Sequence, residues 1–154
     1  MYGKSLDHGK YQRADKILLD TDIFSEVLKE KHQQVTVKAK QYYSQFGHYT
    51  ISTITILEIV KGFHKVKREN DIQRLLTKLR KAEILTLTTT SAELAGRIYA
   101  DLEHTGQPIG RTDPMIAAIA IDRHLVLVTG NKKHYERIQD AGYPLKLTNW
   151  KEPY

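Results

Sequence analysis

The chain has 154 residues, no cysteine and a formal net charge of +6. This length is typical of one compact domain that buries a substantial hydrophobic core. Without cysteine, disulfides, thiolate metal ligands and a cysteine nucleophile are excluded, and a reducing cytoplasmic location is favoured. No apolar run approaches the roughly 20 residues that cross a bilayer, so no membrane anchor is expected. The positive charge is compatible with a polyanionic partner.

Short apolar strands and amphipathic helices alternate through the first half of the chain. Residues 1–14 show no periodicity and are predicted to be a flexible N-terminal segment before a single domain over 15–154. Apolar runs with β-branched residues predict strands, and apolar residues three and four apart predict helices. The elements expected here are a strand at Lys16–Asp20, helices at Ile23–Lys31 and Val35–Phe46, a strand at Tyr49–Thr53, and helices at Ile54–Val66 and Glu69–Lys81.

The second half continues the same alternation. Thr90 and Glu93 match a capping box, which predicts the start of a helix. Asp113 followed by Pro114 predicts a second start, with the aspartate as the N-cap, and the apolar body of that helix predicts burial. The expected elements are a strand at Ile84–Leu87, helices at Thr90–His104 and from Asp113 to Ile121, a strand at Leu125–Val128, a helix at Lys132–Gln139 and a last strand at Leu145–Leu147.

Short apolar strands that alternate with helices indicate a parallel sheet with both faces covered. We therefore expect an α/β protein, a three-layer α/β/α sandwich with a central, mostly parallel sheet of four to five strands. In such open sheets, ligands bind beyond the carboxyl ends of the strands.

Four acidic residues stand at these strand ends or in apolar surroundings: Asp20, Asp22, Glu58 and Asp113. An unpaired carboxylate is costly to bury, and carboxylates brought together repel one another. Such a cluster needs a cation, and hard oxygen ligands without cysteine favour Mg²⁺ or Mn²⁺ over Zn²⁺. These ions can activate water and neutralise charge on a phosphodiester.

Each of these residues also has a purely structural interpretation. Asp20 can end a strand, Asp22 and Asp113 can be helix N-caps, and Thr129 can be a buried strand residue with a satisfied hydroxyl. Glu58 points most strongly to function, because its neighbours from Ile54 to Val60 are mostly apolar. No GxGxxG, GxxxxGK[ST], GxSxG or HExxH pattern is present, which argues against dinucleotide, P-loop, serine-hydrolase and zincin chemistry.

Four segments resemble, in order, the motifs of PIN-domain ribonucleases, in particular the VapC-type toxins of toxin–antitoxin pairs. The resemblance spans Ile17 to about Leu147, and the ordered set is more specific than any one motif. The segments are Ile17-Leu-Leu-Asp-Thr-Asp-Ile23, Thr55-Ile-Leu-Glu-Ile-Val-Lys-Gly62, Gly110-Arg-Thr-Asp-Pro-Met-Ile-Ala-Ala118 and Leu127-Val-Thr-Gly-Asn-Lys-Lys-His-Tyr135.

The resemblance implies a PIN-like fold and a Mg²⁺- or Mn²⁺-dependent endoribonuclease, with tRNA as the family-level substrate guess. It also implies a homodimer and a VapB-like antitoxin encoded next door. Asp20, Glu58 and Asp113 match the family's acidic metal-site positions and are the predicted catalytic residues. Thr129 matches a hydroxyl that lines the family's site, and Thr21 is expected to line it too.

Asn131 departs from the family pattern, which often has aspartate there. The amide oxygen still provides a metal ligand but no charge, so one-metal chemistry, or a second metal that arrives only with RNA, is favoured over a preformed metal pair. Asp22 is the residue that can supply the missing charge. A non-catalytic PIN-like module that binds nucleic acid or protein is the alternative that Asn131 favours. The basic residues expected to hold nucleic acid are Lys61, Arg111, Lys132 and Lys133, whose alternative interpretation is a solvated helix face.

Overall fold

The computed structural model describes residues 15–153, so the predicted flexible segment 1–14 lies outside the described residues. Within the described residues, five short strands form the centre of the molecule, and all of their pairings are parallel. Hydrogen bonds join them in two ladders, β1-β4-β5 and β2-β3, which meet where β1 contacts β2. The predicted sheet of four to five parallel strands is confirmed. The strands are β1 (Ile17–Leu19), β2 (Thr50–Ser52), β3 (Glu83–Leu85), β4 (Val126–Val128) and β5 (Lys146–Thr148).

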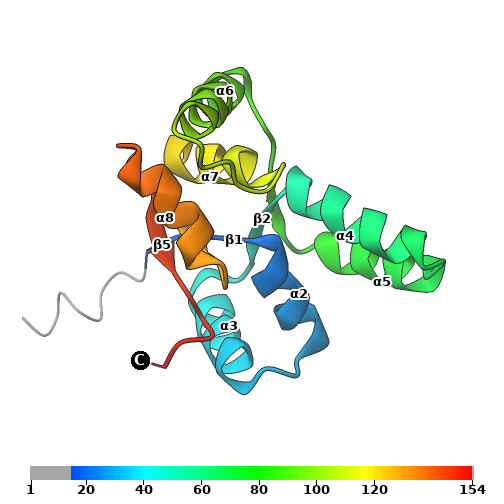
Figure 1. Cartoon of the computed structure of the whole chain (residues 1–154). Helices are drawn as coiled ribbons and strands as arrows, with labels where there is room; N and C mark the ends of the chain where they lie inside the picture. The colour runs from blue at the N-terminus through cyan, green and yellow to red at the C-terminus, as the bar shows by residue number, and fades with distance from the viewer. Residues whose placement is uncertain (1–14, 154) are drawn as a thin grey trace, which may run out of the picture.

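Seven helices connect these strands within residues 15–153 and cover the sheet on both faces (Figure 1). Each lies within a few residues of its predicted range, because the apolar periodicity that predicts a helix is also what packs it against the sheet. None of the helices in the described part is both long and apolar enough to cross a membrane. The helices are α2 (Thr21–Lys29), α3 (Gln33–Phe46), α4 (Thr53–Lys65), α5 (Glu69–Leu79), α6 (Thr89–His104), α7 (Asp113–Asp122) and α8 (Lys132–Asp140).

Alternate strand residues enter two separate hydrophobic cores. Leu18 of β1 and Leu127 of β4 pack with α6, α7 and α8, whereas Leu19 and Val128 pack with α2, α3, α4 and α5. This division follows from the two-residue repeat of a strand, which sends successive side chains to opposite faces. The predicted three-layer α/β/α arrangement is therefore confirmed.

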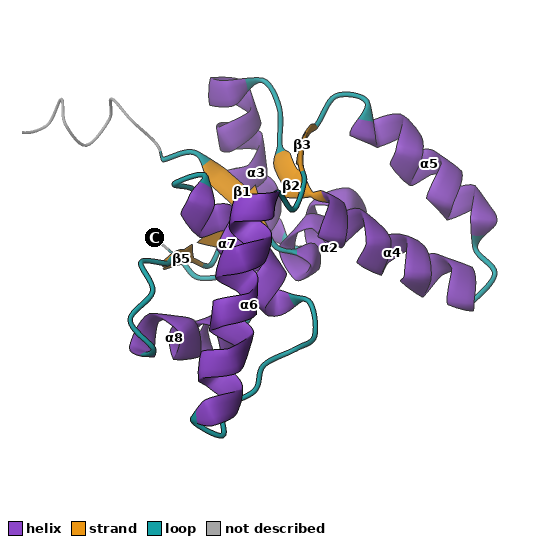
Figure 2. Ribbon diagram, turned by 90° about the horizontal axis from the view of Figure 1, so that it is seen from above, coloured by secondary structure: helices purple, strands orange, loops and turns teal. Residues whose placement is uncertain are grey.

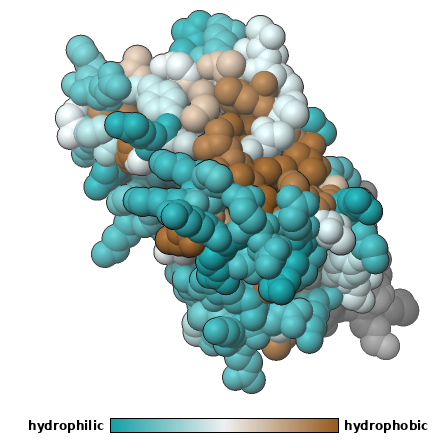
Figure 3. Space-filling model, turned by 90° about the vertical axis from the view of Figure 1, so that its right-hand side faces the viewer, coloured by the Kyte–Doolittle hydropathy of each residue, from teal (hydrophilic) through white to brown (hydrophobic). Residues whose placement is uncertain are grey.

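Helices α4 and α5 lie side by side and extend away from the rest of the molecule (Figure 2). Large apolar side chains remain exposed on this part: Leu57 on α4, Val66 in the turn between the helices, Leu76 on α5 and Ile84 on β3. Figure 3 faces this end of the molecule and shows a continuous apolar area on it. We call these four residues the apolar face.

Two predicted helix starts are wrong by one or two residues. The N-cap of α7 is Thr112, and Asp113 is its first helical residue. The capping box of α6 pairs Thr88 with Ser91, not Thr90 with Glu93. Only Thr90 and Glu93 fit the Ser/Thr-x-x-Glu/Gln pattern, but Ser91 is buried while Glu93 forms a surface ion pair with Arg97, so packing selects Thr88 and Ser91 instead.

The interpretation of Asp22 as the N-cap of the first helix is also wrong. Asp20 caps α2, with one carboxylate oxygen accepting a hydrogen bond from the backbone N–H of Thr21. The helix therefore begins directly after β1, and Asp22 lies within its first turn. This early start turns the side chains of Asp20, Thr21 and Asp22 towards the carboxyl edge of the sheet.

Candidate active site

Asp20 lies where β1 ends and α2 begins, and its side chain is only 6% exposed. Its backbone N–H donates to the carbonyl of Val128, which extends the parallel pairing of β1 and β4 by one residue. Its carboxylate accepts a hydrogen bond from Thr129 at Oδ2 (2.8 Å) and from the Thr21 N–H at Oδ1 (2.9 Å). Asp20 is thus a buried carboxylate held by two neighbouring strand ends.

Glu58 reaches the same edge from α4. The Thr21 hydroxyl donates to its Oε1 at 2.7 Å and lies 3.0 Å from the hydroxyl of Thr55. Because a threonine hydroxyl has one proton and that of Thr21 goes to Glu58, Thr55 is the donor of the second bond. This chain of hydroxyls fixes the orientation of Glu58 relative to β1.

Asp22 is anchored across the edge to the loop that follows β4. Its Oδ2 accepts a hydrogen bond from the backbone N–H of Gly130 (2.9 Å), and its Oδ1 accepts one from Ile23. A Cβ atom at Gly130 would lie 2.6 Å from Asp22 Oδ2, so only glycine permits this close approach. Burial raises the pKa of Asp22, and the positive charge of Lys151 opposes this increase.

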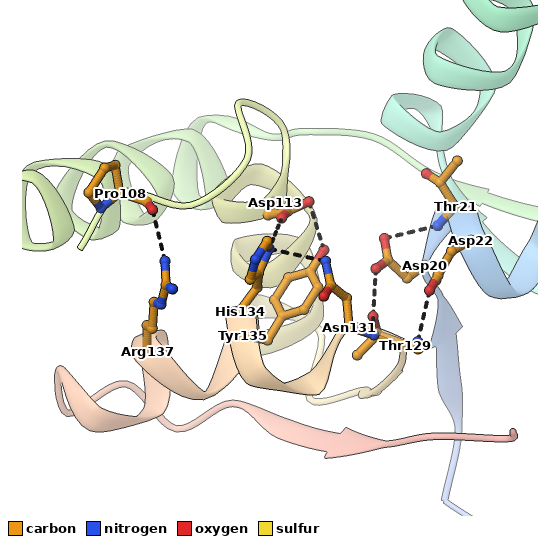
Figure 4. A network of polar contacts seen from close by, with 11 residues as sticks. Asp20, Thr21, Asp22, Pro108, Asp113, Thr129, Asn131, His134, Tyr135 and Arg137 are labelled. Carbon is orange, nitrogen blue, oxygen red and sulfur yellow. Dashed lines mark hydrogen bonds and ion pairs between the residues drawn. The ribbon is translucent and has the colours of Figure 1, made fainter. Parts of the chain in front are cut away.

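Asp113 begins α7 and faces α8 (Figure 4). The hydroxyl of the fully buried Tyr135 donates to Asp113 Oδ1 at 3.2 Å, and His134 Nδ1 lies 4.0 Å from Oδ2. On its other side, a Cβ atom at Gly110 would come within 2.9 Å of Oδ2. The two oxygens of Asp113 therefore have different surroundings: one is bonded to the core, the other lies beside a glycine.

These four acids line one cavity of about 430 Å³, together with Thr21, Gly130 and Asn131. We call it the acidic cavity. Burial raises the pKa of Asp20 to about 7, and the charges of Asp22 and Asp113 add to this increase, while the hydrogen bonds from Thr129 and Thr21 oppose it. Burial also raises the pKa values of Asp22 and Asp113; for Asp113 the hydrogen bond from Tyr135 opposes the increase, and the charge of Glu58 adds to it. The cavity thus gathers negative charge that stays partly uncompensated.

The donors in this cavity fit a hard divalent cation. They are carboxylate oxygens with one amide and one hydroxyl, and they repel one another when no cation is present. Within residues 15–153, however, no three Asp, Glu or His side chains converge closely enough to hold a metal ion by themselves. A Mg²⁺ site does not require three converging protein ligands, because Mg²⁺ keeps several waters and takes only one or two protein carboxylates in typical enzyme sites.

Not all predicted site residues line the cavity. Thr129 is fully buried behind Asp20, where its hydroxyl also accepts the N–H of Asn131 at 3.0 Å. The Asn131 amide is exposed and lies 3.0 Å from His134 Nδ1, so it is bonded to α8 at the cavity wall. Its neighbour Asp22 provides the additional carboxylate at this end of the cavity.

A second hollow of about 590 Å³ adjoins the acidic cavity and shares Glu58 and Asp113 with it. We call it the cationic hollow, because Lys61, Lys65 and Arg111 line it. Lys61 and Arg111 are two of the four predicted basic residues. The other two predicted residues lie elsewhere: Lys132 pairs with Glu152 at 3.7 Å, and Lys133 is exposed on α8. The full lining is Leu57, Glu58, Lys61, Gly62, Lys65, Gly110, Arg111, Thr112 and Asp113.

Sequence reasoning assigned no role to Tyr135, His134, Gly130 or Lys151. Tyr135 and His134 are part of the fourth motif. The linear pattern does not show that their side chains reach Asp113, which precedes Tyr135 by 22 residues. A glycine two residues after the end of a strand was the available signal for Gly130, since glycine at such a place often marks a close backbone approach.

Comparison with known proteins agrees with the fold. The PIN domain family model matches residues 17–140. The chain therefore belongs to the PIN domain family. It is 32% identical over 136 residues to the tRNA(fMet)-specific endonuclease VapC of Salmonella typhimurium, covering 88% of this chain and 98% of that protein. It is 31% identical to ribonuclease VapC2 of Haemophilus influenzae, with 88% and 98% covered.

A solved structure shares the whole architecture. The DNA-bound VapBC of Salmonella typhimurium contains a chain that is 29% identical to this one and superposes with a TM-score of 0.73. The match covers 89% of this chain and 99% of that chain. The predicted PIN-like fold is therefore confirmed by structure as well as by sequence.

Proposed function

We propose that this protein is a metal-dependent endoribonuclease and the toxin of a toxin–antitoxin pair. The observation that carries the proposal is the acidic cavity, where Asp20, Asp22, Glu58 and Asp113 meet at the carboxyl edge of a parallel sheet. The names of the relatives, endonuclease and ribonuclease VapC, support the reaction class.

In this proposal, Asp20, Glu58 and Asp113 would surround Mg²⁺ or Mn²⁺, with one or two of these carboxylates as direct ligands and the rest bound through the waters of the ion, and Asp22 adds negative charge. When bound, the ion acidifies the attacking water and offsets the charge of the phosphodiester. The protein contributes orientation: Thr21 holds Glu58, and Thr129 holds Asp20, so the carboxylates keep their places while they repel one another. Hydrolysis then adds water across one P–O bond of the RNA backbone.

The cationic hollow is the proposed binding site for RNA phosphates next to the cleaved bond. Lys61 and Arg111 line it, and it shares Glu58 and Asp113 with the acidic cavity. Lysine and arginine bind backbone phosphates in a salt-dependent way. Replacement of Lys61 or Arg111 by alanine should therefore raise KM more than replacement of Lys133, and the difference should shrink as salt increases.

For the substrate we propose a tRNA, and for the partner a VapB-like antitoxin encoded beside this chain. The tRNA-specific name of the Salmonella relative and the VapBC title of the solved structure support these two assignments. Sequencing of RNA ends after depletion of the co-expressed antitoxin identifies the cleaved RNA and the position of the cut.

A non-catalytic nucleic-acid-binding module is the second candidate. The feature that favours it is Asn131, whose neutral amide lies 3.0 Å from His134 Nδ1. The two candidates differ in metal binding: a nuclease shows a Mn²⁺-dependent rise in melting temperature that a chelator removes, and a non-catalytic module does not.

Cleavage of purified tRNA by the purified chain tests the proposed function directly. Asp20→Asn and Asp113→Asn should each abolish cleavage and toxicity while the fold is kept, because asparagine has nearly the same shape without the charge. Stability without metal should stay unchanged or rise, since one member of a repelling cluster is neutralised. Full toxicity of either variant at equal expression contradicts the site assignment.

A further inference from the structure

Tyr135 joins the hydrophobic core to the acidic cavity. Its side chain is completely buried and belongs to the core formed with α6 and α7. Its hydroxyl, in contrast, emerges at the polar edge of the sheet and donates to Asp113 Oδ1 (Figure 4). A phenylalanine would fill the same core volume, so packing alone does not account for the hydroxyl.

The hydroxyl lies among negative charges. Burial raises the pKa of Tyr135 well above its usual value, and the carboxylates of Asp20 and Asp113 add to the increase. The group therefore stays protonated and can act only as a donor towards these acids. A hydrogen bond from a neutral donor to a charged acceptor is stronger than one between two neutral groups.

The bond decides which oxygen of Asp113 is available. Oδ1 is engaged by Tyr135, while Oδ2 lies beside Gly110, where even a Cβ atom would come within 2.9 Å. Because Gly110 has no side chain, nothing at that position crowds Oδ2, and the bond from Tyr135 holds Oδ1 on the core side of the carboxylate. His134 Nδ1, 4.0 Å from Oδ2, is the neighbour on the α8 side.

We propose that Tyr135 is a positioning residue that fixes the Asp113 carboxylate through Oδ1 and so keeps Oδ2 free for a divalent cation. The inference rests on the proposed function, because it concerns the metal site of the same nuclease. Tyr135 touches neither RNA nor the reacting atoms in this role; it acts only through Asp113.

Tyr135→Phe tests the role, because it removes the hydroxyl and keeps the buried ring. Mn²⁺ alone, without RNA, is titrated against each protein, with electron paramagnetic resonance measuring the free ion. The dissociation constant for Mn²⁺ should rise about tenfold or more, as expected for the loss of one hydrogen bond to a charged group. With RNA and saturating Mn²⁺, KM for RNA should stay unchanged.

Tyr143→Phe is the matched control. The Tyr143 hydroxyl also donates to an aspartate, Asp101. Asp101 lies on α6 and Tyr143 follows α8, and neither residue lines the acidic cavity. The control should bind Mn²⁺ as the parent does. Binding is expressed per folded molecule, measured by circular dichroism, so a change in stability does not imitate a change in affinity.

The outcomes separate the two levels of the proposal. If Tyr135→Phe binds Mn²⁺ as tightly as the parent, the positioning role is overturned and the proposed nuclease stands. If the parent itself binds no Mn²⁺, the metal-dependent function is overturned, and the role of Tyr135 with it. A weaker affinity in Tyr135→Phe alone supports the role.

Discussion

Asp20 performs two tasks with one carboxylate. One oxygen caps α2 through the Thr21 N–H, and the same group faces the acidic cavity at 6% exposure. Asparagine keeps an oxygen that can accept the capping bond, whereas alanine loses both the cap and the charge. Only the asparagine variant therefore separates the chemical role of this residue from its structural one.

The raised pKa of Asp20 predicts an unusual pH dependence of stability. The folded chain binds a proton at Asp20 up to about pH 7, whereas the usual value is 3.8. Since the folded state binds this proton more tightly than the unfolded state, the free energy of unfolding falls as pH rises from 3.8 to about 7. At about 1.4 kcal/mol per pKa unit, the loss is at most roughly 4 kcal/mol.

Urea unfolding of the metal-free parent and of Asp20→Asn, at pH 4.5 and at pH 7.5 with a chelator present, measures this effect. The parent should lose stability relative to the variant between these two values. The difference between the two proteins cancels the contributions of the acids that do not interact with Asp20. An equal difference at both pH values would contradict a raised pKa at Asp20.

Glu58→Gln tests whether Glu58 is a metal ligand or a structural residue. Glutamine can still accept the hydrogen bond of Thr21, so the melting temperature should change little. Mn²⁺ affinity and cleavage should fall, the latter by orders of magnitude, because only the charge is lost. Glu58 forms no ion pair with the basic residues that the structure describes, so no base is left unpaired by the change. A lower melting temperature with activity per folded molecule kept would assign Glu58 a structural role.

At the level of elements, the loop after β4 shapes the cavity through the absence of a side chain. Gly130→Ala places a Cβ atom within 2.6 Å of Asp22 Oδ2 and should displace that carboxylate from the Gly130 N–H. We expect lower Mn²⁺ affinity and slower cleavage. Titrations with Mn²⁺ that follow metal binding and cleavage separately measure the two effects.

Gly96→Ala is the control for this change. Gly96 lies within α6, and a Cβ atom there meets nothing within 4 Å. Alanine should stabilise the helix by up to about 1 kcal/mol and leave cleavage unchanged. Unchanged metal dependence in Gly130→Ala would mean that the position of Asp22 is not important for the site.

The type and order of the elements could be predicted from the sequence, because apolar periodicity both defines an element and packs it. The position of Asp20 at a strand end and the apolar neighbours of Glu58 likewise indicated a site at the carboxyl edge of the sheet. What could not be predicted depends on packing between distant segments. The selection of Ser91 over Glu93 as capping partner depends on burial, and the reach of Tyr135 to Asp113 depends on how α8 packs beside α7.

At the level of the whole molecule, an acidic and a mainly basic hollow adjoin. The acidic cavity carries four acids, whereas the three basic residues of the cationic hollow (Lys61, Lys65 and Arg111) outnumber the two acids that it shares with the acidic cavity. The net charge of +6 adds a general attraction for RNA that weakens as salt increases.

The apolar face on α4, α5 and β3 is where we expect the homodimer implied by the family resemblance to form. Exposed apolar area of this kind is typical of protein interfaces. Leu76→Glu places a charge on this face, and Leu76 is 44% exposed, so the monomer should fold normally. Sedimentation velocity should show a shift from dimer to monomer.

Val37→Glu is the matched control, because Val37 is also 44% exposed but lies on α3, outside the apolar face. It should leave the sedimentation coefficient of the parent unchanged. If Leu76→Glu sediments as the parent does, this face is not the dimer interface.

The pairing of β1 with β4 also has a consequence for the time at which activity arises in the cell. Asp20 and its partner Thr129 are 109 positions apart, and Asp20 gains this bond only after β4 has paired with β1. At roughly 5 to 20 residues per second, a ribosome needs on the order of 5 to 20 seconds to add this stretch. Throughout this interval the growing polypeptide carries its first acids without the strand that brings them together. During that interval the nascent chain lacks the residues after β4 that complete the acidic cavity.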